Sequence, residues 1–357
     1  MKKILILVND VTTVLQFRSE LIGALVAEGY EVLVSVPKSE RISEIEALGA
    51  KVVETEVARH GKNPLQDLQL LKNYKKLLKS INPDIVLTFT IKPNVYGGMA
   101  CGRLKIPYVS NITGLGVVGE GGLMQKLTLW LYKQGLKKAK CVFFQNQANE
   151  AFFKEKKVVL DKTELLPGSG VNVERFSFME YLNDETINIV FVGRIIKDKG
   201  VFELAQAAEK LKEQDNLRFT IVGDVEYGSE NPFVGVPNVK CVGFHKDVKP
   251  YLATAHAIIL PSYHEGMANV LLEAAACGRP ILASNIPGCQ ETFDEGKTGF
   301  GFESKSTASL CEAIEKFLAL SCEQKRDMGR AGRKKVEEQF NRQIVVDKYL
   351  KQINSLK

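Results

Sequence analysis

Short apolar runs alternate with longer helical segments along almost the whole chain. Near the start, the runs ILILV and EVLVSV are separated by a helical stretch over residues 16–28. Residues 64–80 then form an amphipathic helical pattern that precedes the apolar run IVLTF. Strands that alternate with helices predict a doubly wound, parallel α/β sheet. No G-x-G-x-x-G follows the first strand, which argues against a dinucleotide-dependent oxidoreductase.

A chain of 357 residues is longer than a single hydrophobic core usually supports. A segment that begins at Pro167, PGSGVNVERFSFMEYLNDETIN, is rich in Gly, Asn and Ser and separates two α/β patterns. The sequence therefore predicts an N-terminal Rossmann-like domain over residues 1–175 and a C-terminal one over residues 176–340. A last helix is expected over residues 341–357, crossing back to the first domain.

Composition is that of an ordinary globular protein, with 45% hydrophobic and 25% charged residues. The seven cysteines are scattered and form no C-x-x-C pair, so buried thiols are expected instead of disulfides or zinc ligands. The first residues, MKKILILVND, are expected to be a strand because their apolar run is too short for a signal peptide. No run is long enough to span a membrane. These features predict a cytoplasmic protein.

The net charge of +6 is concentrated in one region, since residues 51–140 carry 15 Lys and Arg against 5 Asp and Glu. A basic region of this kind suits an anionic surface, such as phospholipid headgroups or a lipid-linked diphosphate. No basic motif with interleaved aromatic residues indicates nucleic acid.

The segment PSYHEGMANVLLEAAACGRP, which begins at Pro261, carries the strongest chemical signal. The apolar run AIILP leads into it, so a polar loop is expected between a buried strand and a helix that starts near Ala268. The leading N–H groups of such a helix are a natural seat for a phosphate. Glu273, about one turn into the helix, can accept two hydrogen bonds from a ribose diol, and Glu265 lies in the loop. Taken alone, the segment also fits a helix with two solvated glutamates.

A second strand-turn-helix segment, INIVFVGRIIKDKGVFELAQAAEKL, lies upstream. Gly193 lets the chain bend where the strand ends, and Arg194 and Lys199 leave the turn at the same edge of the sheet. An Arg fork and a Lys point charge can neutralise the charge that develops on a departing nucleoside diphosphate. Because ligands of open α/β sheets bind at this edge, the two segments together predict a nucleotide-sugar site.

The motifs GR-x4-KG, SYHEG-x2-NVLLEAAACGRP and ASNIPGCQE resemble those of the retaining nucleotide-sugar glycosyltransferases of family four. The resemblance implies the GT-B fold, in which two Rossmann-like domains face a central cleft. It implies that Arg194 and Lys199 bind the diphosphate, that Glu273 binds the ribose, and that Glu265 lies near the donor sugar; Glu265, Arg194 and Lys199 form the expected catalytic set. Further donor-binding positions implied by it are Gly193, Val242, Gly243, Phe244, Gly266, Met267, Ala268, Asn269 and Val270.

In the first half, R-x-G-x-NP, TIKPN-x-YG and NITGLG resemble a bacterial subgroup that extends lipid-linked glycans for capsule, O-antigen or protein glycosylation. The acceptor-side candidates are Arg59, Lys92, Asn94, Asn111, Thr113 and Gly114. Many members of the wider family carry a histidine where Thr113 stands, so the catalytic group of the first domain stays unassigned. Each of these loops also fits an ordinary turn.

Residues 121–140, GGLMQKLTLWLYKQGLKKAK, are expected to form a helix that contains the sole tryptophan, Trp130, and five lysines. Such a helix can lie in the plane of lipid headgroups, with Trp130 and Tyr132 as anchors, or face the core with a solvated lysine edge. The lipid-linked acceptor implied by the resemblance favours peripheral contact with the inner face of the cell membrane.

The sequence thus predicts a retaining glycosyltransferase that moves a hexose or N-acetylhexosamine from a UDP-sugar to an undecaprenyl-diphosphate-linked saccharide. No D-x-D motif occurs, so neither a metal ion nor another cofactor is expected. A UDP-sugar epimerase of the same fold and a non-catalytic scaffold of a polysaccharide assembly complex are the alternatives.

Overall fold

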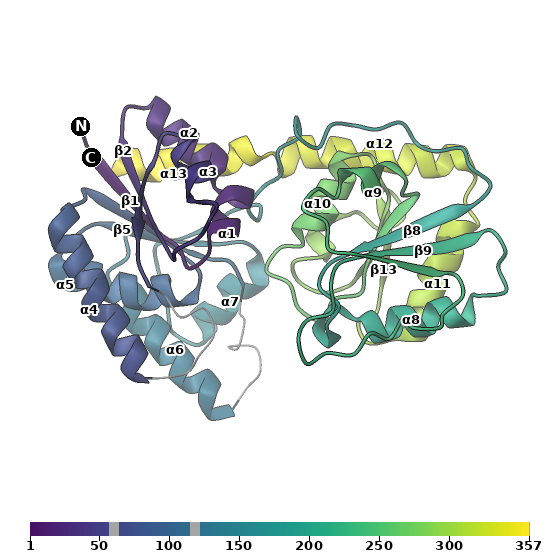
Figure 1. Ribbon diagram of the computed structural model, residues 1–357, viewed down its shortest axis with the longest axis horizontal. Helices are drawn as coiled ribbons and strands as arrows, with labels where there is room; N and C mark the ends of the chain where they lie inside the picture. Colours follow the sequence, from purple (N-terminus) through teal and green to yellow (C-terminus); the bar gives the residue numbers. More distant parts are fainter. Residues whose placement is uncertain (57–63, 115–121, 357) are drawn as a thin grey trace. The chain divides into compact units, whose positions relative to one another are not determined.

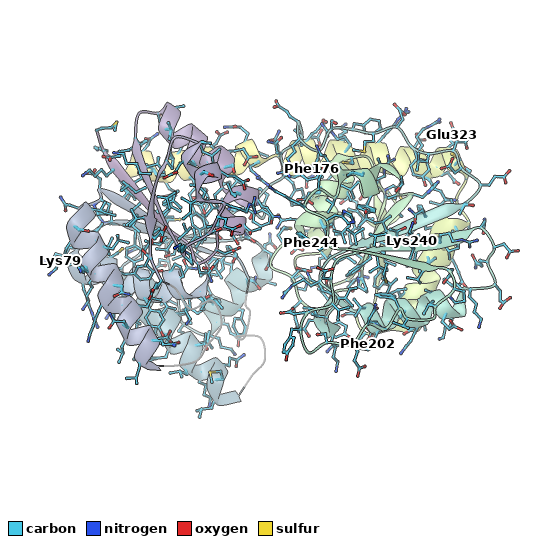
Figure 2. The ribbon with its side chains drawn as sticks, viewed as in Figure 1. Lys79, Phe176, Phe202, Lys240, Phe244 and Glu323 are labelled. Atoms are coloured by element: carbon cyan, nitrogen blue, oxygen red, sulfur yellow. The ribbon has the colours of Figure 1, made fainter. Side chains whose placement is uncertain are left out.

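The structure, a computed structural model, describes residues 1–56, 64–114 and 122–356. The chain forms two compact units (Figure 1). The first comprises Met1–Ser169 together with Gln343–Lys357, and the second comprises Gly170–Arg342. The division falls at the start of the segment expected to be a linker, and Val171 and Phe176 of that segment are buried in the core of the second unit (Figure 2).

The first unit is built on a parallel sheet of seven strands in the order β3-β2-β1-β4-β5-β6-β7. The strands are β1 (Lys3–Leu7), β2 (Glu31–Val36), β3 (Lys51–Glu54), β4 (Ile85–Phe89), β5 (Tyr108–Ile112), β6 (Cys141–Phe144) and β7 (Thr163–Leu165). Every residue of β4, β5 and β6 is buried, as expected when helices cover both faces of a parallel sheet. The predicted α/β architecture is confirmed.

Helices pack on both faces of this sheet and form two separate apolar cores. They are α1 (Val11–Phe17), α2 (Ser19–Ala27), α3 (Ile42–Glu46), α4 (Pro64–Ile81), the π-helical turn η1 (Pro93–Gly97), α5 (Gly98–Leu104), α6 (Gly122–Leu136), α7 (Gln147–Glu155) and α13 (Arg342–Ser355). The single helix expected over residues 16–28 is two helices, because Asp10 caps a helix that starts at Val11 and Arg18, with φ −129°, interrupts it. Tyr349 of α13 packs on Phe89 and Phe143 of the first sheet.

The second unit has a parallel sheet of six strands in the order β10-β9-β8-β11-β12-β13. The strands are β8 (Ile187–Val192), β9 (Leu217–Val222), β10 (Val239–Gly243), β11 (Ala257–Leu260), β12 (Ile281–Ser284) and β13 (Gly299–Phe302). The helices are the 3-10 turn η3 (Lys197–Lys199), α8 (Val201–Lys210), α9 (Lys249–Ala253), α10 (Asn269–Ala276), the 3-10 turn η4 (Gln290–Thr292), α11 (Thr307–Leu318) and α12 (Cys322–Gln339).

Both sheets reverse their strand order at one point. In the first sheet β1 lies beside β4, and in the second β8 lies beside β11, so the chain leaves these neighbours in opposite directions. Ligands of open α/β sheets bind outside the carboxyl ends of strands at such a point. The loops after β4, β8 and β11 are therefore where binding residues are expected.

Candidate functional site

The turn after β8 is packed against the end of β11 with no room for a side chain. Gly200 has φ +67°, and a Cβ on it would lie 2.0 Å from the carbonyl oxygen of Pro261. Nearby, the N–H of Tyr263 donates to the carbonyl of Asp198 at 2.8 Å. Glycine at position 200 is thus required by both conformation and space. This packing brings the two motifs singled out in the sequence side by side.

Lys199 and Glu265 form an ion pair at this junction, with 2.5 Å between Nζ and Oε1. The hydroxyl of Ser262 donates to the same carboxylate oxygen at 2.8 Å. The two charged side chains are only 23% and 13% exposed, so water screens the pair weakly. Glu265 therefore holds the Lys199 cation in a fixed position, which is a preorganised site for negative charge.

Arg194 also follows β8 but reaches into solvent. Its side chain is 63% exposed and pairs with Glu226 at 2.7 Å. Exposed ion pairs contribute about 0–1 kcal/mol, so a diphosphate that accepts a two-pronged contact can take this guanidinium from Glu226. The Arg194 side chain is held far less firmly than that of Lys199.

The start of α10 offers fewer free amides than the sequence suggests. The N–H of Ala268 donates to Gly288 at 2.8 Å and that of Asn269 to Met267 at 3.0 Å. In the described part of the chain, Val270 is the helix-start residue whose N–H keeps no partner. The buried Oδ1 of Asn269 is likewise without a partner among the described residues. A phosphate here would meet the Val270 amide first.

Glu273 lies in the middle of α10 and is half-buried. Burial raises the pKa of its carboxyl to about 7, against the opposing effect of Arg342 and Arg175. No hydrogen bond to this carboxylate is formed within the described residues. A desolvated carboxylate without donors is suited to accept hydrogen bonds from a diol.

The segment expected to read a nucleobase follows β10. The carbonyl of Gly243 accepts from Gly223 at 2.8 Å, and the N–H of Phe244 donates to Asp224 at 3.0 Å. These two backbone groups are therefore engaged within the protein. The Phe244 ring is 69% exposed and offers a flat apolar face instead (Figure 2).

On the first unit, the charged acceptor candidate after β4 is paired within the fold. Lys92 forms an ion pair with Asp67 of α4 at 3.0 Å, and the same carboxylate accepts from the Tyr96 hydroxyl at 2.9 Å. Both charged side chains are less than 20% exposed, at 14% and 19%. Lys92 thus joins α4 to the turn η1.

The two asparagine candidates are fully buried in the first unit. Asn94 accepts from the Thr88 hydroxyl at 2.7 Å and donates to the Asn111 carbonyl at 2.8 Å. Asn111 in turn donates to the Tyr349 hydroxyl at 2.6 Å. These bonds fix the ends of β4 and β5. Thr113 and Gly114 follow β5 and are half-buried, whereas Arg59 lies outside the described residues.

Thr90, the first residue of the TIKPN-x-YG motif, is not among the acceptor-side candidates predicted from the sequence; it directly follows β4 at the reversal point of the first sheet. Its φ is +67°, a left-handed conformation that a β-branched residue rarely adopts and that costs roughly 1–2 kcal/mol. Its Oγ1 is buried without a partner in the described part of the chain. Strain of this kind concentrates at binding sites, so Thr90 joins the acceptor-side candidates. No sequence pattern marks a left-handed threonine.

Thr90→Gly is expected to raise the free energy of unfolding by about 1 kcal/mol, because glycine adopts φ +67° without strain. The same change removes the hydroxyl, so kcat/KM for the sugar transfer that the sequence predicts is expected to fall. Lys105→Gly is the matched control, since Lys105 is exposed and left-handed with φ 58° at the end of α5. Thermal melts and initial rates for both variants test the role; equal activities would show that Thr90 is only strained.

Two family models match the chain. Residues 172–335 match glycosyl transferases group 1, and residues 3–146 match glycosyl transferase 4-like. The chain is 29% identical over 363 residues to the N,N'-diacetylbacillosaminyl-diphospho-undecaprenol alpha-1,3-N-acetylgalactosaminyltransferase of Campylobacter jejuni, with 95% of each chain covered. It is 27% identical over 273 residues to the UDP-Gal:alpha-D-GlcNAc-diphosphoundecaprenol alpha-1,3-galactosyltransferase of Escherichia coli, with 70% of each covered.

Solved structures share the fold over almost the whole length. A glycosyltransferase from Rickettsia africae superposes with a TM-score of 0.83 at 20% identity, covering 99% of this chain and 98% of that one. Anabaena HepE in complex with UDP and glucose gives a TM-score of 0.82 at 16% identity, covering 99% and 100%. Two parallel α/β sheets with this strand order, and two matching family models, lead to one conclusion: the chain is a glycosyltransferase of the group 1 and 4-like family, with the GT-B fold.

Proposed function

We propose that this glycosyltransferase moves a hexose or N-acetylhexosamine from a UDP-sugar to an undecaprenyl-diphosphate-linked saccharide, with retention of the anomeric configuration. The main support for binding of the donor is the Lys199–Glu265 ion pair, which lies where the neighbouring strands β8 and β11 end. The printed functions of the Campylobacter jejuni and Escherichia coli relatives support the lipid-linked acceptor. Another relative is the capsular polysaccharide biosynthesis glycosyltransferase CapM of Staphylococcus aureus. It is 28% identical to this chain over 319 residues, with 78% of this chain and 80% of that one covered.

The chemistry follows from charge. As the bond between the sugar and UDP breaks, negative charge grows on the distal phosphate. Lys199 and Arg194 neutralise that charge, and the Val270 amide donates to it. The departing phosphate oxygen then accepts the proton of the attacking hydroxyl. A histidine in place of Thr113 is therefore not needed as a base. Lys199 and Arg194 supply the positive charge that a divalent metal ion would otherwise provide, and we propose that no metal ion is required.

The nucleoside is held at two places in this proposal. The Glu273 carboxylate accepts hydrogen bonds from both ribose hydroxyls, and the exposed Phe244 ring stacks on the base. Because the Gly243 carbonyl and the Phe244 amide are engaged with Gly223 and Asp224, base recognition depends on stacking more than on these backbone groups.

Transfer is tested by UDP release with purified full-length protein. The protein is incubated with UDP-hexose or UDP-N-acetylhexosamine, with and without an undecaprenyl-diphosphate-linked monosaccharide, in the presence of EDTA. Release that requires the lipid-linked acceptor and survives EDTA is the expected result. UDP release that proceeds equally without acceptor, or sugar isomers in place of UDP, would favour an epimerase. No turnover with UDP binding intact would favour a scaffold.

An exposed apolar surface on the first unit supports the lipid-linked acceptor. The amino-terminal ends of α4 and α6 lie at the same end of the first unit (Figure 1), and they carry exposed large apolar side chains. We call these the apolar rim: Leu65 (76% exposed), Leu68 (57%), Leu123 (84%), Met124 (38%), Leu127 (50%) and Trp130 (55%). Lys126 and Lys133 of α6 and Lys137, which directly follows it, are exposed as well. In the described residues, no helix is long and apolar enough to cross a bilayer.

The other face of α6 belongs to the core, so only the exposed face of the helix is free to contact lipid. Tyr132 is 1% exposed and packs edge-on against Phe153, so it is not a membrane anchor. Thr128 and Leu136 are buried beside it. We propose that α6 lies flat at the inner leaflet, with Trp130 among the headgroups and the lysines toward anionic lipid.

The double variant Leu127→Ser/Trp130→Ser is expected to weaken binding to anionic vesicles by about tenfold or more, because two exposed apolar side chains are lost from the apolar rim. Leu160→Ser is the matched control, since Leu160 is 62% exposed in the same unit but outside the apolar rim. Vesicle sedimentation measures both. Equal recovery of the double variant and the control, or no preference for anionic over neutral vesicles, would contradict docking through α6.

A further inference from the structure

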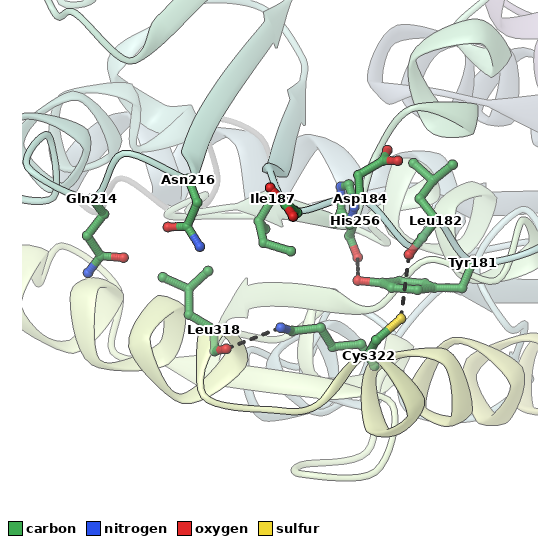
Figure 3. Close-up of a pocket in the computed structure, with 11 residues that line it drawn as sticks. Tyr181, Leu182, Asp184, Ile187, Gln214, Asn216, His256, Leu318 and Cys322 are labelled. Carbon is green, nitrogen blue, oxygen red and sulfur yellow. Dashed lines mark hydrogen bonds between the residues drawn. The ribbon is translucent and has the colours of Figure 1, made fainter.

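A cavity lies at the amino ends of the strands of the second sheet, at the edge opposite the donor-side loops. Its volume is about 230 Å³, and Figure 3 draws the 11 residues that line it. Ile187 begins β8, Asn216 precedes β9, and His256 precedes β11. Arg194 and Glu265 follow the carboxyl ends of β8 and β11. The length of these strands therefore separates the cavity from the donor side.

His256 lines this cavity and carries a hydrogen-bond donor that has no partner among the described residues. Its ring is 2% exposed, and its Nδ1 accepts the main-chain N–H of Asn188 at 3.1 Å. A main-chain N–H can only donate, so Nδ1 carries no proton and the ring proton is on Nε2. Burial lowers the pKa of this imidazole, which agrees with a neutral ring. Within the described residues Nε2 has no partner, and a buried N–H without an acceptor is rare in native proteins.

Lys325 of α12 adds a buried cation. It is 6% exposed, and its Nζ donates to the carbonyl of Leu318 at 3.1 Å, the dashed line beside Leu318 in Figure 3. An ammonium group has three N–H donors, so two remain for a ligand. None of the ion pairs in the described part of the chain includes this lysine.

The remaining walls are apolar inside and polar at the rim. Ile187, Leu318 and the ring of Tyr181 line the cavity, and the Tyr181 hydroxyl is already engaged as a donor to the His256 carbonyl at 3.2 Å. Three exposed polar side chains and the half-buried Gln214 complete the rim; the exposed ones are Asp184, Glu185 and Asn216. The two carboxylates are in water, where their repulsion of an anion is screened.

We propose that this cavity binds a small oxyanion, a carboxylate or a phosphate group, which accepts hydrogen bonds from His256 Nε2 and Lys325 Nζ. Both available groups are donors, so the complement must be an acceptor, and the buried cation selects a negative one. The rest of the ligand lies against Ile187 and Leu318. Such a ligand joins the residue before β11 to α12. The site is independent of the proposed transfer reaction.

Histidine NMR tests the proposal directly, since the chain has four histidines: His60, His245, His256 and His264. Full-length protein with ¹⁵N-labelled histidine is titrated with inorganic phosphate in one arm and acetate in the other, and His256→Asn assigns the signal. A saturating shift of the His256 Nε2 signal is expected in at least one of the two titrations. The titration that produces it shows whether the site prefers phosphate or a carboxylate. His264, in the loop after β11, reports phosphate at the donor side separately. Absence of a saturating His256 shift in both arms overturns the proposal.

Lys325→Met keeps the aliphatic stem and removes the charge. This variant is expected to bind the oxyanion at His256 with roughly tenfold lower affinity. Lys316→Met on α11 is the control, because Lys316 is exposed and lines no part of this cavity. Unchanged affinity in Lys325→Met overturns the assignment. Should that variant fail to fold, the melting temperature of the wild type decides: it must rise with the bound oxyanion, and His256→Asn must abolish the rise.

Discussion

Lys199→Met is expected to lower kcat by at least about 100-fold while donor affinity falls less, because the lost cation acts mainly on charge that develops in the transition state. The ion pair with Glu265 explains why this residue matters more than its neighbours, since the carboxylate fixes Nζ before substrate arrives. Steady-state kinetics of the variant give both quantities. Lys197→Met is the matched control, because Lys197 lies in the same turn and is exposed.

Removing Lys199 also leaves the mostly buried Glu265 carboxylate unpaired, which destabilises a protein. The double variant Lys199→Met/Glu265→Gln, compared with Glu265→Gln alone, separates this effect from the catalytic role of Lys199. It is expected to recover the melting temperature of the wild type without recovering kcat. Restored turnover in the double variant would mean that Lys199 serves only to neutralise Glu265, and the proposed role of the cation would be wrong.

Glu273→Gln is expected to weaken UDP-sugar binding by about 2–3 kcal/mol and to remove its dependence on pH. In the free protein the pKa of Glu273 is raised to about 7 by burial. Two ribose hydroxyls that donate to the carboxylate favour its charged form, so binding lowers this pKa and releases a proton below pH 7. Affinity of the wild type should therefore rise from about pH 5 to 7 and then level off.

Calorimetry with a UDP-sugar measures this linkage, because the phosphates of a UDP-sugar are diesterified and do not titrate near neutrality. Stability supplies a second readout with a defined sign. The pKa of Glu273 in the folded protein, about 7, lies above the ordinary value of 4.5. Ionisation of this carboxyl therefore lowers the free energy of unfolding as the pH rises from 4.5 to 7. Glu273→Gln should raise the melting temperature at pH 8 and leave it unchanged at pH 4. A pH-independent affinity in the wild type would contradict the ribose contact.

That the two motifs proposed as the donor side lie at one sheet edge could be predicted from the sequence, because their residues lie at strand ends. Arg194 and Lys199 follow one apolar run and Glu265 follows another, and parallel strands place all such ends at one edge. The Lys199–Glu265 pair itself was beyond sequence reasoning, because it depends on the approach of Gly200 to Pro261. Family resemblance supplied the individual roles, which geometry alone does not assign.

The first unit was less predictable, because its polar residues are partnered by distant ones. Lys92 meets Asp67 of α4, and Asn94 meets Thr88 and Asn111. A motif such as TIKPN shows charged and amide side chains but not whether the fold has already engaged them. The amides at the start of α10 were unpredictable for the same reason. The N–H of Ala268 donates to the carbonyl of Gly288, which lies in a separate loop.

The packing of α13 has a consequence for how the protein is made. Tyr349 and Ile353 belong to the same apolar core as β1 and β4, although the entire second unit intervenes in the chain. The N-terminal lobe therefore lacks part of its interior until α13 has been synthesised, whereas the second lobe can fold as soon as Arg342 emerges. Nascent chains stalled before residue 342 should expose the unfinished N-terminal lobe to chaperones and proteases.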